Sequence, residues 1–101
     1  IGMAYKPDVN DTRESPSIKI FKTLTKHKNI VDYYDAKIPK MKIYGKYIYS
    51  VPLNKVTKYD FVIIATNHSN LNKNLILKKA KRIFDSRGIY SEFSNKKIIK
   101  V

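Results

Sequence analysis

The sequence predicts an α/β domain in which a mainly parallel sheet is flanked by helices. Apolar runs of strand character alternate with segments of helical periodicity, in the order β-α-β, an irregular stretch, then β-α-β. Residues 61–65 are apolar on both faces, which is typical of a central strand in a parallel sheet. These observations favour the doubly wound, Rossmann-like class. The length of 101 residues predicts a single domain that spans residues 1–101.

The first half of the chain predicts a strand, a helix and a second strand. Residues 1–4 are expected to be the end of the first strand. Ser15 and Pro16 predict a helix start, because Ser caps free N–H groups and Pro is tolerated in the first turn. Residues 26–28 are basic and predict the end of this helix, where the helix dipole favours positive charge. A β-rich run over 30–34 predicts the second strand.

The second half predicts shorter elements after an irregular stretch. Residues 36–50 contain Pro39 and Gly45, which break any long element, so only a short extended piece around 47–49 is expected there. The further expected elements are one or two helical turns over 52–58, a central strand over 61–65, a helix over 71–79, a strand over 82–85 and a final edge strand over 97–101.

The formal net charge is +13, from 21 Lys and Arg against 8 Asp and Glu. This charge first suggests nucleic acid, but only three basic residues are Arg and the Lys are scattered along the chain. We therefore expect a solvated surface that adheres weakly to any polyanion, and no specific nucleic acid. The absence of Cys excludes disulfides and thiolate sites. No signal-like segment or long apolar run is present, which favours a cytoplasmic protein without membrane contact.

Two cations follow the first expected strand. Lys6 comes directly after it, and Pro7 biases Lys6 towards an extended conformation. Ligands of open α/β sheets bind outside the carboxyl ends of the strands, so Lys6 is a candidate phosphate contact, although most Lys are surface residues. Arg13 precedes the helix start, and it either forms a local ion pair with Asp11 or Glu14 or reaches phosphate oxygens beside the helix end.

Other strand ends carry further candidates. Arg87 follows the strand over 82–85 and is either a turn residue in solvent or a second phosphate contact. His68 follows residues 61–65 and is expected at a helix start or in packing, because no orienting partner is evident. The tyrosines of residues 44–49 either stack on single-stranded bases or, as we favour, pack beneath an irregular connection. No nucleophile–base pair or metal-ligand cluster is evident, so no catalytic residue and no metal site is predicted.

Several segments resemble one known family. Residues 4–7 and 11–16 closely resemble the opening of the C-terminal domain of the UDP-glucose/GDP-mannose dehydrogenase family. Weaker matches follow in the family's order at residues 34–35, 62–66 and 84–87. The resemblance extends over essentially the whole chain, and residues 67–69 are most similar to the UDP-N-acetylhexosamine 6-dehydrogenases.

This resemblance implies a function. In the family, an N-terminal Rossmann domain binds NAD, a central helical region supports the dimer, and the C-terminal domain binds the UDP-sugar. The reaction oxidises the sugar C6 alcohol to a carboxylate through a thioester on a Cys. Carried over by position, the resemblance implies that Tyr5, Lys6 and Arg87 contact the UDP-sugar and that Arg13 reaches NAD.

The resemblance also implies what this chain lacks. With three Gly and no Cys, the chain holds neither the glycine-rich NAD fingerprint nor the catalytic Cys. It is therefore expected to be the nucleotide-sugar-binding C-terminal domain of a three-domain, homodimeric enzyme of polysaccharide precursor synthesis. As a fragment it would not be catalytic alone, and it would need the missing N-terminal and central domains as partners.

Two alternatives stay open. A small basic nucleic-acid-binding module predicts single-strand affinity that falls steeply with salt and depends on the tyrosines of residues 44–49. A non-functional remnant of a dehydrogenase predicts marginal thermal stability and no saturable ligand.

Overall fold

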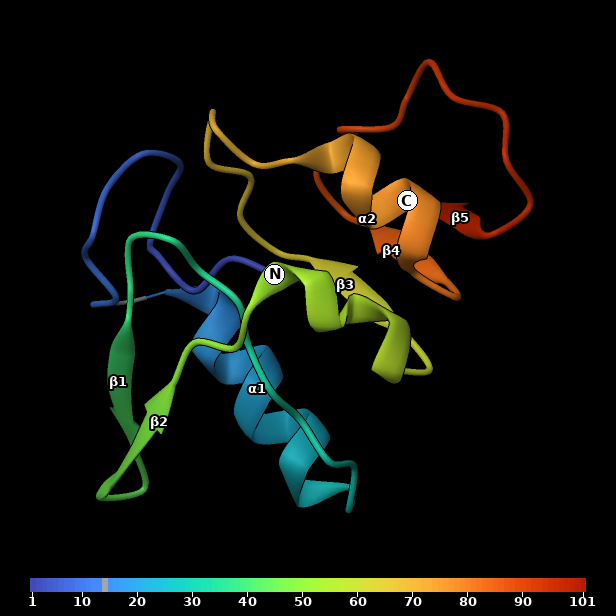
Figure 1. The fold of residues 1–101 in the computed structure, drawn as a ribbon. Helices are drawn as coiled ribbons and strands as arrows, with labels where there is room; N and C mark the ends of the chain where they lie inside the picture. Colours follow the sequence, from blue (N-terminus) through green and yellow to red (C-terminus); the bar gives the residue numbers. More distant parts are fainter. Residues whose placement is uncertain (14) are drawn as a thin grey trace.

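The computed structural model describes residues 1–13 and 15–101. Within these residues it contains a three-stranded parallel sheet, a separate two-stranded hairpin, two α-helices and one 3₁₀-helix. The elements are α1 (Pro16–Lys26), β1 (Lys40–Ile43), β2 (Lys46–Tyr49), η1 (Leu53–Lys58), β3 (Val62–Ile64), α2 (Lys73–Lys79), β4 (Ile83–Asp85) and β5 (Ile98–Lys100). Figure 1 shows the hairpin and the three-stranded sheet on opposite sides of α1.

Helix α1 begins where the sequence predicts. Ser15 is its N-cap, and the Ser15 side chain accepts a hydrogen bond from the Ser17 N–H at 3.3 Å. Pro16 occupies the first turn, where its missing N–H costs no helical hydrogen bond. The helix ends at Lys26, with His27 as C-cap. The predicted helix is thereby confirmed.

The parallel sheet has the order β3-β4-β5. Val62 pairs with Ile83, and Ile83 pairs with Ile98 on its other side. The strands predicted at 61–65, 82–85 and 97–101 are confirmed, each shorter than predicted, and β5 is an edge strand. The mixed α/β class with a parallel sheet is therefore confirmed, at a size of three strands.

The strands expected at 1–4 and 30–34 are not formed as regular strands. Ile1 is nevertheless held beside β3 by main-chain hydrogen bonds, and Tyr34 is held to Gly2 in the same way. The Ile1 nitrogen donates to Ile63 O at 2.6 Å, the Ala65 N–H donates to Ile1 O at 2.8 Å, and the Gly2 N–H donates to Tyr34 O at 2.9 Å. Gly2 has φ +92°, which interrupts the extended conformation that a continuous ladder requires.

The stretch predicted to be irregular over 36–50 contains the hairpin of β1 and β2, so the extended piece expected around 47–49 is confirmed as part of β2, and the irregular structure expected for the rest is wrong at β1. Ile43 pairs with Lys46, so only Tyr44 and Gly45 form the turn. Both have positive φ, 51° and 76°, as in the type I′ turn that matches the twist of two antiparallel strands. Gly45 therefore makes the tight turn possible and does not simply end an element.

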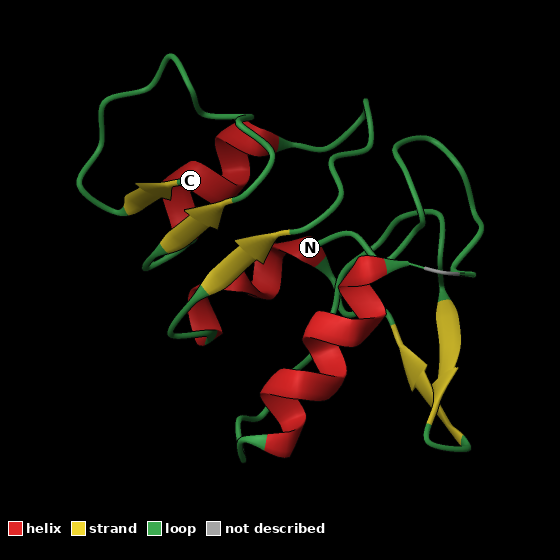
Figure 2. Cartoon of the chain, turned by 180° about the vertical axis from the view of Figure 1, so that it is seen from behind, coloured by secondary structure: helices red, strands yellow, loops and turns green. Residues whose placement is uncertain are grey.

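Two apolar clusters hold the fold together. The first joins α1 to the hairpin and the N-terminal segment, and its buried residues are Met3, Ala4, Phe21, Tyr33, Ile38, Met41 and Ile43. The second joins α2 and η1 to the sheet, and its buried residues are Val56, Val62, Ile64, Ile76, Ala80, Ile83 and Tyr90. In Figure 2 α1 lies in front of the sheet and α2 behind it. The N-terminal segment lies at the junction of the two clusters, because Ile1 packs on the second and Met3 belongs to the first.

Candidate functional site

Three loops meet at the carboxyl edge of the sheet. They follow residues 1–4, β3 and β4, and they span residues 5–13, 65–69 and 86–90. The first loop bonds to the second through Asp8, and the third bonds to the second through Arg87. This edge is where ligands of parallel α/β sheets bind, and the polar side chains of the three loops gather there.

Asp8 fastens the first loop to the second. Its N–H donates to His68 Nδ1 at 2.8 Å, and its carboxylate accepts the Ser69 N–H at 2.8 Å and the Ser69 hydroxyl. Asp8 has φ 65°, a left-handed conformation that Asp tolerates better than most residues. The hydrogen bonds from Ser69 lower the pKa of Asp8, so the carboxylate form holds the loop.

His68 is buried against a carboxylate that the sequence did not reveal as its partner. Asp35 Oδ1 lies 2.8 Å from His68 Nε2, and both side chains are almost fully enclosed. Because His68 Nδ1 already accepts the Asp8 N–H, Nε2 must carry the proton and donate it to Asp35. Asp35 Oδ2 in turn accepts the N–H groups of Met3 and Ala4.

Asp35 is ionised at neutral pH. Burial alone raises its pKa, but the hydrogen bonds from the Met3 N–H and from His68 outweigh this effect, and the pKa lies below its ordinary value. The carboxylate therefore fixes the end of the N-terminal segment and the His68 ring together. The prediction that His68 serves packing agrees with this geometry, whereas the expectation that it lacks an orienting partner is wrong.

Arg87 projects from the loop after β4. Its Nε–H donates to Ala65 O at 2.6 Å, which places the guanidinium group at the carboxyl end of β3. The loop itself is held by the buried Asp85, whose carboxylate accepts the N–H groups of Arg87, Ile89 and Tyr90 at 3.3, 3.1 and 2.8 Å. Arg87 as a residue is exposed. Within the described residues, Nε is the only side-chain donor of Arg87 that has a hydrogen-bond partner.

Arg13 forms the local ion pair that the sequence allowed as one alternative. Its Nε and Nη2 donate to Asp11 Oδ2 at 3.2 and 2.8 Å, and Nε also donates to Oδ1 at 3.1 Å. These hydrogen bonds lower the pKa of Asp11 to about 2. The Arg13 side chain is 88% exposed, so the pair lies in solvent. Glu14, the other predicted partner, lies outside the described residues.

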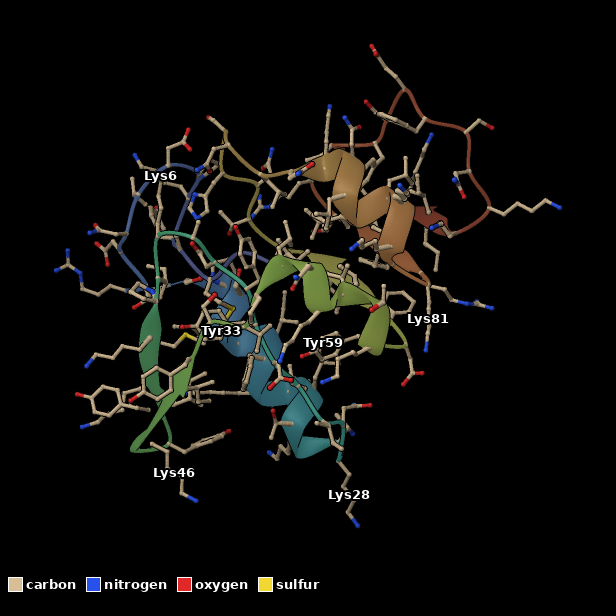
Figure 3. The ribbon with its side chains drawn as sticks, viewed as in Figure 1. Lys6, Lys28, Tyr33, Lys46, Tyr59 and Lys81 are labelled. Atoms are coloured by element: carbon tan, nitrogen blue, oxygen red, sulfur yellow. The ribbon has the colours of Figure 1, made fainter. Side chains whose placement is uncertain are left out.

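Tyr5 and Lys6 are both exposed on the first loop. The Tyr5 side chain is at the surface with the residue 50% exposed, and the Tyr5 N–H donates to Asp11 O at 2.6 Å. Figure 3 labels Lys6 at one edge of the molecule, away from Lys46 at the hairpin turn and Lys81 ahead of β4. Within the part of the chain that the structure describes, neither a hydrogen bond nor an ion pair engages the Lys6 ammonium group.

A comparison with models of known protein families identifies the family of this chain. Residues 1–92 match the model of the UDP-glucose/GDP-mannose dehydrogenase family, UDP binding domain. The chain belongs to this family. Searches of curated proteins and of solved structures found no match.

The loops that carry the predicted site residues lie at one edge of the sheet, and each is held there by its own contacts. The loop of Lys6 and the loop of Arg87 both attach to residues 65–69, the first through Asp8 and the second directly. Arg13 belongs to the same first loop but is engaged by Asp11. No hydrogen bond or ion pair joins Lys6, Arg13 and Arg87 to each other among the described residues.

Sequence reasoning missed the residues that hold these loops in place. Asp8 and Asp35 were not singled out as functional, because their partners are 60 and 33 positions away in the chain. A signal was present, since Asp35 and His68 each follow a β-rich run and the carboxyl ends of parallel strands share one edge. The same placement at the carboxyl ends of strands therefore predicts that Asp35 and His68 lie close together.

The glycines of this domain do not form a glycine-rich dinucleotide-binding loop. Each of its three glycines has another task. A Cβ on Gly2 would lie 2.1 Å from Thr66 O, Gly45 is in the hairpin turn, and Gly88 turns the loop after β4 at φ 72°. None opens a helix after a strand, as the glycines of a dinucleotide-binding loop do.

A groove of the domain lies elsewhere. It has a volume of about 840 Å³, runs between α1 and β3, and is lined mainly by apolar side chains that include Phe21, Leu24 and Ile63. Lys6, Arg13 and Arg87 do not line it. Among the described residues, no group of three His, Asp or Glu is placed to hold a metal ion. No helix in the described part of the chain is both long and apolar enough to cross a bilayer.

Proposed function

We propose that the carboxyl edge of the sheet binds the diphosphate of a UDP-sugar, with Lys6 and Arg87 contacting phosphate oxygens and Tyr5 lining the site. The observation that carries this proposal is the attachment of both cationic loops to residues 65–69 in a chain of the UDP-binding family. The hydrogen-bonded order Tyr34, Gly2, β3, β4, β5 is that of a doubly wound sheet, and we infer that the domain is a reduced member of this class.

The chemistry of this edge suits a diphosphate. A guanidinium group anchored through Nε presents its other N–H donors in a fixed plane, which favours paired hydrogen bonds to phosphate oxygens. The start of α1 is adjacent, because the Ser15 hydroxyl donates to Ala4 O at 3.4 Å. Free N–H groups at a helix start favour an anion, so the dipole of α1 adds to the charge of Lys6.

The proposal extends to the enzyme in which such a domain works. The domain would present the UDP-sugar to an NAD-binding domain, and the C6 alcohol would be oxidised to a carboxylate with NAD as acceptor and a Cys as the covalent site. Both lie outside this chain, which is not catalytic alone, and we expect the whole enzyme to be a cytoplasmic homodimer of polysaccharide precursor synthesis.

Arg13 is the one residue that we propose for NAD. Its pairing with Asp11 orients the guanidinium group outward and leaves one terminal nitrogen without a partner in the described residues. A phosphate of NAD held by another domain would meet it there. Arg13 would therefore contribute one contact to an NAD site that the other domain provides.

The sugar preference rests on residues 67–69, and we propose the UDP-N-acetylhexosamine branch. His68 is buried against Asp35, and Ser69 is hydrogen-bonded to Asp8. These two side chains would therefore set the shape of the loop, while Asn67 is the half-buried member that is free to face the sugar.

Titration of the ¹⁵N-labelled domain with UDP and UDP-sugars, followed by NMR, tests the proposal. We expect saturable shifts in the loops of Lys6 and Arg87. Arg87→Gln should weaken binding about tenfold to a hundredfold, because a charge-assisted hydrogen bond is lost. The matched control is Lys81→Gln, which removes one charge ahead of β4, at the other edge of the sheet, and should leave the affinity unchanged.

Three results would contradict this site. Shifts confined to residues 44–49 would place the nucleotide on the hairpin, and equal losses in Arg87→Gln and Lys81→Gln would show that only net charge matters. A stably folded domain without saturable shifts would indicate a remnant that no longer binds nucleotide.

A further inference from the structure

The hairpin presents one face that the core does not use. Its inner side chains, Met41, Ile43 and Ile48, pack into the cluster with α1. Its outer face carries two lysines from β1 and two tyrosines from β2, which the register sets directly opposite each other. The residues of this tyrosine–lysine face are Lys40, Lys42, Tyr47 and Tyr49.

The tyrosines of this face are far from buried. Tyr47 is 55% and Tyr49 63% exposed, and Tyr44 in the turn is 69% exposed. The expectation that these tyrosines pack beneath an irregular connection is therefore wrong. Large aromatic side chains left at the surface add little to the stability of a fold, and a contiguous group of them marks an interaction surface.

Lysines already lie over the tyrosine rings. Lys40 Nζ and Lys42 Nζ are 4.9 and 5.2 Å from the centroid of the Tyr47 ring. Lys22 Nζ, from α1, is 5.1 Å from the centroid of the Tyr44 ring. Positive charge and flat π surfaces are thereby interleaved on one side of the hairpin.

The surrounding charge is of one sign. Residues 36–59 contain six Lys and no Asp or Glu. Ion pairs in the described residues join only Arg13 to Asp11 and His68 to Asp35, so no carboxylate among these residues pairs with the lysines of the tyrosine–lysine face. The lysines are spread along the sequence, but the fold brings several of them together beside exposed tyrosines. Composition alone does not reveal this grouping.

We propose that the tyrosine–lysine face binds single-stranded nucleic acid without sequence preference. Bases stack on tyrosine rings regardless of their identity, and the phosphates between them pair with lysines. Tyr47 and Tyr49 lie two residues apart on the same face of a strand, about 7 Å, which allows successive bases to stack on successive rings.

The side chains of the tyrosine–lysine face favour nucleic acid over a membrane surface or an acidic peptide. A membrane surface favours aliphatic and aromatic side chains that enter the acyl region, and the outer face offers Tyr and Lys without an exposed aliphatic residue between them. An acidic peptide would satisfy the lysines but would leave the tyrosine rings unused. In Figures 1 and 2 the hairpin that carries this face lies across α1 from the three-stranded sheet.

Fluorescence anisotropy with a labelled oligothymidine of about 12 nucleotides tests the proposal. Tyr47→Ser with Tyr49→Ser should weaken binding about tenfold or more, whereas Tyr47→Phe with Tyr49→Phe keeps the rings and should retain binding. Lys40→Gln with Lys42→Gln should reduce the slope of log K against log salt by about 1.4, since two phosphate contacts are lost. All four side chains are exposed, so circular dichroism should show an unchanged fold.

The matched control is Lys78→Gln with Lys79→Gln on α2, which removes the same charge from a distant exposed site. If this control weakens binding as much as Lys40→Gln with Lys42→Gln, or if the Ser variants bind as well as the parent, the interaction is general attraction to polyanions and the proposal is wrong. Binding to phosphatidylserine vesicles or to heparin that depends on both tyrosines, without oligothymidine binding, would also overturn it.

Discussion

Asp35 Oδ1 lies 2.8 Å from His68 Nε2 in the interior, and this contact joins segments that are 33 residues apart. Asp35 also accepts the N–H groups of Met3 and Ala4, while His68 accepts the N–H of Asp8. The pair therefore connects the N-terminal segment, its loop and the loop after β3. The position of Lys6 depends on this connection, because Lys6 lies between Ala4 and Asp8.

Replacing His68 should loosen the Lys6 loop as well as the core. His68→Ala leaves the Asp8 N–H without its acceptor and leaves Asp35 Oδ1 with the Lys37 N–H as its one remaining hydrogen bond, so we expect a loss of about 2–3 kcal/mol in the free energy of unfolding. Urea denaturation measures this loss, and UDP affinity should fall in the same variant. His27→Ala is the control, since His27 is exposed and should change stability by less than about 0.5 kcal/mol. Similar stability of the two variants would show that the buried contact does not hold the loop.

The same contact makes the domain sensitive to acid. The pKa of Asp35 in the folded state lies below its ordinary value of 3.8, because hydrogen bonds to the carboxylate outweigh burial. A group with a lowered folded pKa stabilises the fold above its ordinary pKa, and this contribution is lost as the pH falls through the folded value. We therefore expect the urea midpoint to be steady near neutral pH and to fall below about pH 4.

Asp35→Asn isolates the contribution of this carboxylate. It should lower stability at neutral pH and flatten the acid dependence, because the group that binds the proton is gone. Asp60→Asn, at an exposed position, removes the same charge and should reproduce the parent profile. An unchanged acid slope in Asp35→Asn would assign the pH dependence to other carboxylates, such as Asp8 and Asp11, whose pKa values are also lowered.

Gly2 and Gly88 should differ sharply in their tolerance of alanine. Both have positive φ, 92° and 72°, but a Cβ at Gly2 would lie 2.1 Å from Thr66 O, whereas nothing lies within 4 Å of one at Gly88. Gly88→Ala should cost about 1 kcal/mol from backbone strain alone. Gly2→Ala must also push the N-terminal segment away from β3 and should cost about 3 kcal/mol or more. Thermal unfolding of both variants measures the difference, and equal melting temperatures would show that the close approach at Gly2 is not needed.

The sequence was most informative where local chemistry decides the structure. Ser15 and Pro16 specify the start of α1 through the cap and the first turn, and the apolar run at 61–65 specifies β3. The turn at Tyr44 was not predictable in the same way, since an aromatic residue with φ 51° contradicts its usual conformational preference. Met41, on the inner face of the hairpin, packs into the first apolar cluster, and this tertiary contact stabilises a hairpin that the local preference of Tyr44 does not favour.

The sequence predicted candidate contacts at the ends of strands but not the hydrogen bonds that connect their loops. The rule that ligands bind at the carboxyl ends of parallel strands selects Lys6 and Arg87 from the sequence alone as candidate contacts. It did not reveal that Arg87 Nε bonds to Ala65 O or that Asp35 orients His68, because pairing between distant segments depends on register and loop shape. The family match shows a UDP-binding domain, and the contacts between its loops are seen in the structure.

The ion pair of Arg13 and Asp11 should be visible in the titration of one carboxyl group. Hydrogen bonds from Arg13 lower the pKa of Asp11 to about 2, below its ordinary value of 3.8. Arg13→Gln removes the guanidinium group, so the pKa of Asp11 should return towards 3.8, as followed by the carboxyl ¹³C shift against pH. The pair is exposed to solvent, so stability should barely change. Arg82→Gln, an exposed Arg ahead of β4, should leave Asp11 unaffected. A pKa of Asp11 near 3.8 in the parent would show that Arg13 does not stay on the carboxylate in solution and is free for a ligand without displacement.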